Sequence, residues 1–343
     1  MREDWQEEEL ADPRGRTDIL SAGCLRREAG TLVFETAGEE REIPVAAVDN
    51  LCIHSDVTFD VGVLKCAAEN GVMISVMDQT DGLIGRFMPN TPLRSPVVTR
   101  EQLAAYYEPD HRVALAKEFV LAAIHNLRLV IRYYHKMHPH TACQKALTAI
   151  NAAEKKIKEC GEVEELLVLE AGVHAAYFGL FDHFLENTEF RFEKRTRRPP
   201  KNEVNAMISF CDTVLYHLVA AEIYPTPLDI RVGFLHASNR RQESLNLDVA
   251  ESFRPLVVDR TVLTLLNLRA IRREHFDYQE DRVLLNREGQ RVVLRALYRR
   301  LGVSVEVSRK QHMTYEEAIR EDVRKLVRYF KNGETFHAFH QVR

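Results

Sequence analysis

The sequence predicts an α+β protein, in which a small β-rich N-terminal domain precedes a larger all-helical domain. Two observations predict this division. Up to about Phe87, short β-branched runs alternate with turn signals such as EAGT and AGEE. From about Glu108 onwards, apolar residues recur instead with the helical period of about 3.6 residues.

The elements of the first part follow from local signals. Residues 1–16 form an acidic extension that lacks the apolar centre of a signal peptide. Residues 17–90 form the β-rich domain, with strands predicted in TLVFET, REIPVAAV, NLCIHS and VMISVMD and one helix over 59–69. Residues 91–107 are predicted to be a linker, because the surrounding stretch MPNTPLRSPVV contains three prolines.

Residues 108–343 form the helical domain in this interpretation. The apolar periodicity predicts helices over 111–137, 143–160, 162–186, 202–222, 244–268, 288–301 and 314–331. Asn202 is a suitable N-cap for one of them and Ser244 for another. Pro255 should end or kink the helix in which it lies, since proline lacks the amide proton of a helical hydrogen bond.

Composition excludes several classes of protein. The chain has 343 residues, of which 45% are hydrophobic, and this is enough for sizeable cores. No apolar run approaches the ~18–20 residues of a membrane span, so we expect a cytoplasmic protein without a membrane partner. The six cysteines have no CxxC spacing, which favours reduced thiols over a zinc site. The net charge of −4 confines any nucleic-acid binding to a local basic groove.

Glu170 is the most informative residue of the chain. It lies in the middle of an apolar helix face formed by Leu166, Val173, Tyr177, Phe181 and Phe184. An ionised carboxylate buried without a partner costs several kcal/mol. A cation, a hydrogen-bond donor or a metal must therefore reach it in space. His174, four residues later on the same face, is either a hydrogen-bond partner or a local metal ligand.

Two further segments carry ligand-type residues. His236 stands at the end of the apolar run RVGFLH, where a packing role is the simpler interpretation. Asp248 and Glu251 lie three residues apart near a helix start, which suits the helix dipole but also puts both carboxylates on one face. Together with Glu170 they predict a mixed oxygen and nitrogen site for Mg²⁺ or Mn²⁺, and the imidazole tilts the choice toward Mn²⁺.

A basic segment provides a candidate nucleic-acid surface. Residues 191–201 read RFEKRTRRPPK, and two prolines hold the segment extended. A solvated interhelical loop is the plain alternative. The candidate DNA-binding residues are Arg195, Arg197, Arg198, Lys201, Arg240 and Arg241. A metal site beside such a groove is typical of phosphodiester chemistry.

Four motifs together resemble a known family. They are LEAGVHAAYFGLF around Glu170, TRRPPKNEVNAMISF at 196–210, GFLHAS at 233–238 and SLNLDVAESFRPLVVDR at 244–260. The chain resembles the CRISPR-associated integrase of the spacer-acquisition module, the larger of the two near-universal Cas proteins, over roughly residues 17–340. The RRPP form of the second motif looks like a type I-C relative.

The resemblance implies a catalytic site and a fold. It implies that Glu170, His236 and Glu251 are the catalytic metal ligands, with Asp248 as a further candidate. It implies a β-rich domain used for dimerisation and a helical catalytic domain. Two departures stand out: the acidic extension, and Glu-Ala-Gly in the first motif where relatives more often have Glu-Gly.

The resemblance also implies a reaction and partners. A 3′-hydroxyl of a short DNA duplex attacks a phosphodiester at the CRISPR repeat, as part of antiviral defence, and the same site can hydrolyse DNA. Two integrase dimers flank one dimer of the small second universal Cas protein.

Two alternatives use the same residues. One is a stand-alone metal-dependent nuclease on branched DNA or RNA. The other is a non-catalytic nucleic-acid scaffold, in which Glu170 pairs with an arginine such as Arg254.

Overall fold

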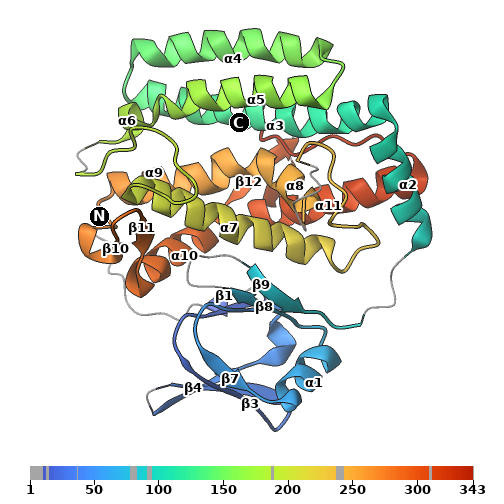
Figure 1. Ribbon diagram of the computed structural model, residues 1–343, viewed down its shortest axis with the longest axis vertical. Helices are drawn as coiled ribbons and strands as arrows, with labels where there is room; N and C mark the ends of the chain where they lie inside the picture. Colours follow the sequence, from blue (N-terminus) through green and yellow to red (C-terminus); the bar gives the residue numbers. More distant parts are fainter. Residues whose placement is uncertain are drawn as a thin grey trace. The chain divides into compact units, whose positions relative to one another are not determined.

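The computed structural model describes residues 11–12, 15–36, 38–77, 83–90, 95–186, 189–236, 243–308 and 311–342. The chain divides into two compact units, residues 1–92 and residues 93–343 (Figure 1). The first is rich in strands and the second is largely helical, which confirms the predicted fold class.

The N-terminal unit contains two sheets. One is five-stranded, in the order β1 (Ala11–Asp12), β2 (Arg16–Ile19), β6 (Asn50–Ile53), β8 (Met73–Met77) and β9 (Leu83–Phe87). The other is four-stranded, in the order β5 (Glu39–Ile43), β4 (Thr31–Thr36), β3 (Gly23–Glu28) and β7 (Val57–Phe59). Helix α1 (Val61–Glu69) begins at Asp60, whose side chain accepts a hydrogen bond from the Val63 N–H.

Apolar side chains from both sheets and from α1 form one core. Leu25 and Leu32 come from the second sheet, Leu51 and Ile74 from the first, and Val63 from the helix. The predicted acidic extension takes part in this unit, because β1 pairs antiparallel with β2. Residues 1–10 of that extension lie outside the described residues.

The C-terminal unit follows the predicted helices closely. Its helices are α2 (Pro96–Tyr107), α3 (Pro109–Met137), α4 (Thr141–Glu159), α5 (Val163–Phe178), α6 (Phe181–Phe184), α7 (Glu203–Ile223), α8 (Leu245–Arg254), α9 (Arg260–Asn267), α10 (Arg287–Leu301) and α11 (Tyr315–Asn332). Helices α3, α4 and α5 pack against one another (Figure 1).

Two features of this unit differ from the prediction. Residues 96–107, assigned to a linker from their prolines, form α2, because Pro96 occupies the first turn, where a missing N–H costs nothing. The unit is also not wholly helical. It contains two short hairpins, one of β10 (Phe276–Tyr278) and β11 (Val283–Leu285), the other of β12 (Ser304–Ser308) and β13 (Gln311–Thr314).

Helices α7 and α8 form the centre of the unit. Asn202 caps α7 as predicted, since its side chain accepts a hydrogen bond from the Asn205 N–H. Contrary to the expectation from the sequence, α7 is long and apolar enough to cross a membrane by length and composition, but 67% of its apolar window is buried inside the fold, as in a core helix. Between α8 and α9, Pro255–Asp259 form a π-helical turn, so Pro255 distorts the helix without ending it.

Candidate metal centre

Two carboxylates from different helices meet at one histidine. Glu170 and His174 lie on α5, and Glu251 lies on α8. The Nε2 atom of His174 is 2.8 Å from Glu170 Oε1 and 2.8 Å from Glu251 Oε1. One ligand atom from each residue lies within 4.8 Å of the others, so the group is compact enough to hold a metal ion.

The helix patterns explain why these carboxylates face inward. On α5, Leu166, Val173 and Tyr177 are buried, and the Glu170 side chain on the same face is only 16% exposed. On α8, the three-residue spacing puts Asp248 and Glu251 on one buried face. Both helices pack against α3, and this packing brings the two glutamates together. The hydrogen-bond donor that the apolar stripe requires for Glu170 is His174.

Asp248 holds the segment that carries His236. Its carboxylate accepts hydrogen bonds from the backbone N–H groups of Phe234 (2.5 Å), Leu235 (3.0 Å) and His236 (2.9 Å). The His236 ring also contacts it, with Nδ1 3.0 Å from Oδ1. Both oxygens of Asp248 are therefore occupied within the protein, which favours a positioning role over the metal-ligand role considered for it from the sequence.

Gly233 and Ser244 complete this turn. A Cβ atom at Gly233 would lie 2.9 Å from Asp248 Oδ2, so only glycine allows the close approach. The sequence suggested that the Ser244 side chain caps α8, but it makes no capping hydrogen bond. Its hydroxyl instead accepts a hydrogen bond from the Gly233 N–H at 2.9 Å, and it donates one to the Arg231 carbonyl at 2.8 Å.

The charges in the centre compensate one another. Burial alone lowers the pKa of His174, but hydrogen bonds to Glu170 and Glu251 outweigh it and raise the pKa to about 9. Burial raises the pKa of Glu251, but Arg254 and His174 together hold it well below its usual range. His236 has a raised pKa, because its hydrogen bond to Asp248 and the charges of Asp248, Glu251 and Glu170 overcome the effect of burial.

Behind Glu251 lies a row of buried ions. Arg254 donates from Nε to Asp212 Oδ1 at 2.9 Å, and its Nη1 lies 3.4 Å from each oxygen of Glu251. Arg195 donates to the other oxygen of Asp212 at 3.2 Å. The scaffold alternative expected Arg254 to pair with Glu170. The structure instead pairs Arg254 with Asp212 and Glu251.

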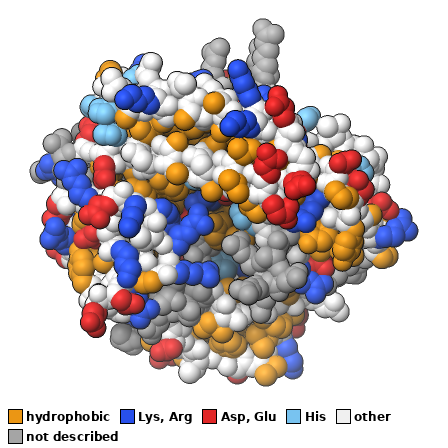
Figure 2. All heavy atoms as spheres, turned by 45° about the horizontal axis from the view of Figure 1, so that its top comes forward, with side chains coloured by type: hydrophobic (Ala, Val, Ile, Leu, Met, Phe, Trp, Pro, Cys, Tyr) orange, Lys and Arg blue, Asp and Glu red, His pale blue; other side chains and the backbone are white. Residues whose placement is uncertain are grey.

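The basic segment divides into buried and exposed parts. The Arg195 side chain is 11% exposed and also donates to Asn205 and Ser209, so it is a structural residue rather than the predicted surface contact. Arg197 and Arg198 are exposed, and Lys201 donates from its exposed side chain to the Asp281 carbonyl. The remaining two candidates, Arg240 and Arg241, lie outside the described residues. Lys and Arg side chains are grouped in parts of the face shown in Figure 2, beside acidic ones, so positive charge is local there.

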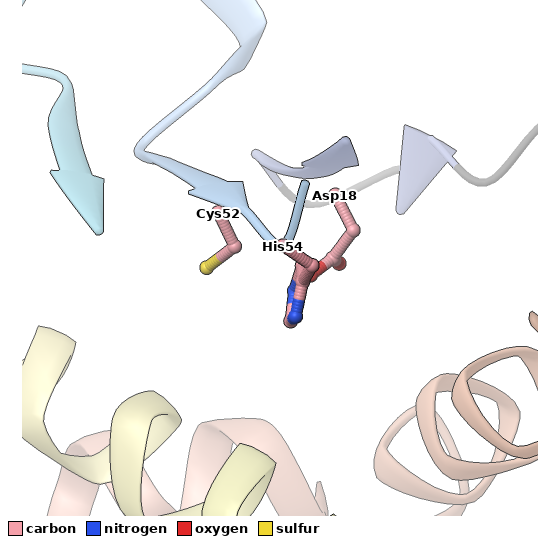
Figure 3. Close-up of side chains that lie close together, drawn as sticks. All are labelled: Asp18, Cys52 and His54. Atoms are coloured by element: carbon pink, nitrogen blue, oxygen red, sulfur yellow. The ribbon is translucent and has the colours of Figure 1, made fainter. Parts of the chain in front are cut away.

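A second group of ligand-type side chains lies in the N-terminal unit. Asp18 and Cys52 are paired across β2 and β6, and His54 follows on the same side (Figure 3). Arg16 already pairs with Asp18 at 3.5 Å and donates to Cys52 Sγ at 3.3 Å. Burial raises the pKa of the Cys52 thiol to about 11, so the thiolate that a metal requires is disfavoured. A cation would also meet the nearby charges of Arg16 and Arg86. We therefore interpret this cluster as a hydrogen-bonded part of the sheet and not as a metal site.

Asp212 was missed by the sequence reasoning. It lies in the apolar helix segment ISFCDTVLY, where a lone carboxylate is the same kind of signal that identifies Glu170. Its side chain is 8% exposed. The same rule, applied to every apolar helix, would have found it.

Comparison with known proteins gives a consistent picture. Residues 19–299 match the family described as CRISPR associated protein Cas1. The chain is 34% identical over 322 residues to CRISPR-associated endonuclease Cas1 2 of Thermodesulfovibrio yellowstonii, covering 94% of this chain and 97% of that protein. It is 33% identical to CRISPR-associated endonuclease Cas1 of Thermotoga maritima, with 91% and 90% covered.

Solved structures share the fold. A Cas1 protein from Thermotoga maritima superposes with a TM-score of 0.83 at 30% identity, covering 94% of this chain and 99% of that one. A casposase bound to integration product has a TM-score of 0.81 at 20% identity, with 94% and 92% covered. At 20% identity, this second match shows only that the two proteins share a fold.

Proposed function

Because the chain belongs to the Cas1 family of CRISPR-associated endonucleases, the integrase family of spacer acquisition, we propose that Glu170, His236 and Glu251 hold its divalent metal. The observation that carries this proposal is the convergence of the Glu170 and Glu251 carboxylates, from two helices, at one buried point. The type I-C assignment stays a prediction from the RRPP motif.

The donor set suits Mg²⁺ or Mn²⁺. Two carboxylates supply oxygen ligands, and hard divalent cations prefer oxygen. His236 supplies the nitrogen ligand, because Asp248 engages Nδ1 and leaves Nε2 available. The hydrogen bonds to Glu170 and Glu251 raise the pKa of His174 to about 9 in the metal-free centre. In the proposed centre His174 holds the two glutamates through these hydrogen bonds, at 2.8 Å each.

The proposed substrate is DNA. When bound, the metal would polarise the attacked phosphoryl oxygen and stabilise the leaving oxygen. Glu170, His236 and Glu251 fix its place, and Arg197, Arg198 and Lys201 contact phosphates. Arg240 and Arg241, outside the described residues, are proposed for the same surface from the sequence. The nucleophile is a 3′-hydroxyl for integration or water for hydrolysis.

We propose that the chain works as a homodimer with the small second Cas protein. The structural neighbours include a Cas6-RT-Cas1–Cas2 complex, with a TM-score of 0.81 at 20% identity, of which this chain covers 36%. The assembly named there is that of the neighbour, and we propose a corresponding partner for this chain. The β-rich unit is the proposed dimerisation surface, since small sheets have edges that need cover.

A strand-transfer assay tests this function. The purified chain and its partner protein are incubated with a labelled duplex that carries a 3′-hydroxyl, a repeat-containing target and Mn²⁺. We expect joined product from wild type and none from Glu170→Ala, His236→Ala or Glu251→Ala. Glu164→Ala is the control, because Glu164 is exposed in the first turn of the same helix α5.

The same assay separates the alternatives. Cleavage without joining would favour a stand-alone nuclease. Joining that survives in Glu170→Ala would refute the proposed site.

A further inference from the structure

We propose that Asp212 and Arg254 form a positioning clamp that keeps Glu251 available as a metal ligand. This inference rests on the proposed function, because it takes Glu251 as a ligand. Neither residue touches the reacting groups in the proposed mechanism. Both act through Glu251, so they are positioning residues.

The geometry of Arg254 is the first step of the argument. Arg254 lies three residues after Glu251, on the same face of α8, and its side chain is only 4% exposed. Its guanidinium engages both oxygens of Asp212, at 2.9 Å and 3.3 Å. This two-point contact fixes the plane of the guanidinium, which a single hydrogen bond would leave free to turn.

The contact with Glu251 is different in kind. Nη1 of Arg254 lies 3.4 Å from both Glu251 oxygens, longer than the ~2.7–2.9 Å of a strong charge-assisted hydrogen bond. Arg254 therefore attracts and orients the carboxylate without occupying its lone pairs fully. One further contact to Glu251 is that of His174 Nε2 with Oε1, at 2.8 Å. Because Asp212 holds the guanidinium, the remaining lone pairs of Glu251 stay available for a cation.

The charge balance supports the same conclusion. Asp212 lies between Arg254 and Arg195, so one carboxylate compensates two guanidinium groups. Removing its charge leaves two positive groups behind the metal centre and frees Arg254 to pair closely with Glu251. Both effects weaken cation binding. Loss of a group that orients a metal ligand typically costs about 10–100-fold in metal affinity.

Direct counting of bound Mn²⁺ tests the clamp. The full-length variants Asp212→Asn and Arg254→Lys are titrated with Mn²⁺, and free Mn²⁺ is read from its electron paramagnetic resonance signal. Lysine keeps the charge of Arg254 but cannot engage both Asp212 and Glu251 as a planar fork. We expect both variants to need roughly 10–100-fold more Mn²⁺ for half-saturation. Strand transfer should recover when Mn²⁺ is raised to saturation.

Glu222→Gln is the matched control. Glu222 lies on the same helix α7 and pairs through both oxygens with Arg320 on α11, at 3.0 Å and 3.0 Å. Its loss removes a two-point bridge between helices that is more exposed than that of Asp212 and does not touch Glu251. We expect its Mn²⁺ midpoint to stay at the wild-type value. A merely structural role for Asp212 predicts a wild-type Mn²⁺ midpoint for folded Asp212→Asn, as for this control, whatever the loss of stability.

The outcomes separate the clamp from the proposed function. Unchanged Mn²⁺ binding by Glu251→Ala would refute the ligand set and the clamp with it. Lost binding in Glu251→Ala, with wild-type midpoints in Asp212→Asn and Arg254→Lys, would refute the clamp alone. If Asp212→Asn does not fold, Arg254→Lys decides the question, because it retains the charge and most of the volume.

Discussion

Replacing Asp248 by asparagine should destabilise the helical unit and misplace His236. The carboxylate accepts three backbone hydrogen bonds and contacts the His236 ring, and the residue is fully buried. Asparagine has the same shape but only one acceptor oxygen. If that oxygen serves Phe234 and Leu235, the amide NH₂ group faces the N–H of His236, which then has no acceptor.

The cost follows from these contacts. Two hydrogen bonds lose the charge of the acceptor, at about 1 kcal/mol each, and one buried N–H loses its partner, at about 1–3 kcal/mol. The sum is roughly 3–5 kcal/mol. Urea unfolding should show this loss in the helical unit. At temperatures where the variant is folded, strand transfer should fall about 10–100-fold, because His236 loses the group that orients it.

Asp322→Asn is the control for this prediction. Asp322 is also buried, but it accepts from one backbone N–H, that of Phe339 at 2.6 Å, and from Lys325 at 2.8 Å. It should cost less stability and leave the chemistry alone. The reasoning is refuted if Asp248→Asn is no more destabilising than Asp322→Asn, or if it retains wild-type strand transfer.

Three further predictions concern DNA binding, pH and assembly. Arg197→Ala with Arg198→Ala should weaken binding equally for unrelated DNA sequences and lower the salt slope by roughly 1–2, at about 0.9 per phosphate; an unchanged slope in binding titrations would count against these contacts. Burial raises the pKa of Asp259 to about 7, so its contribution to stability is full below about pH 4 and is lost as the pH rises through about 7. Asp259→Asn should remove the fall in the free energy of unfolding between about pH 4 and about pH 7. An unchanged pH dependence would contradict the raised pKa of Asp259. In sedimentation at micromolar concentration the full chain should behave as a dimer, and a strict monomer would exclude dimerisation through the β-rich unit.

Apolar pattern and helix-end signals predicted the long helices. The stretch 143–160 corresponds to α4 at Thr141–Glu159, and 202–222 corresponds to α7 at Glu203–Ile223. Apolar periodicity did not predict the shorter and irregular elements. The predicted helix 162–186 divides after Phe178 into α5 and α6, although the apolar pattern continues across the break. The hairpins after residue 270 have strands of three to five residues, too short for a clear alternating pattern.

The site could be predicted where a charged residue lies among apolar neighbours on its helix. Glu170 stood out because its neighbours on the helix are apolar, and the structure places His174 against it at 2.8 Å. The position of Arg195 was not predictable in this way. Its sequence neighbours are polar and basic, as on a surface, and only the fold brings Asp212 to it. Burial of an ion can be predicted from sequence when its own helix is apolar, and cannot when its sequence neighbours are polar.

These observations also explain why conservative substitutions are needed to dissect the centre. Glu170, His174, Glu251, Arg254, Asp212 and Arg195 form a continuous row in which acidic and basic groups alternate. Each ion in the row compensates its neighbours, so removing one leaves an uncompensated buried charge at the next position. Alanine scanning of such a row measures that penalty together with the role of the residue, and the values are not additive. Asp212→Asn and Arg254→Lys change one property at a time. Only a metal-binding readout then separates positioning of Glu251 from a general loss of stability.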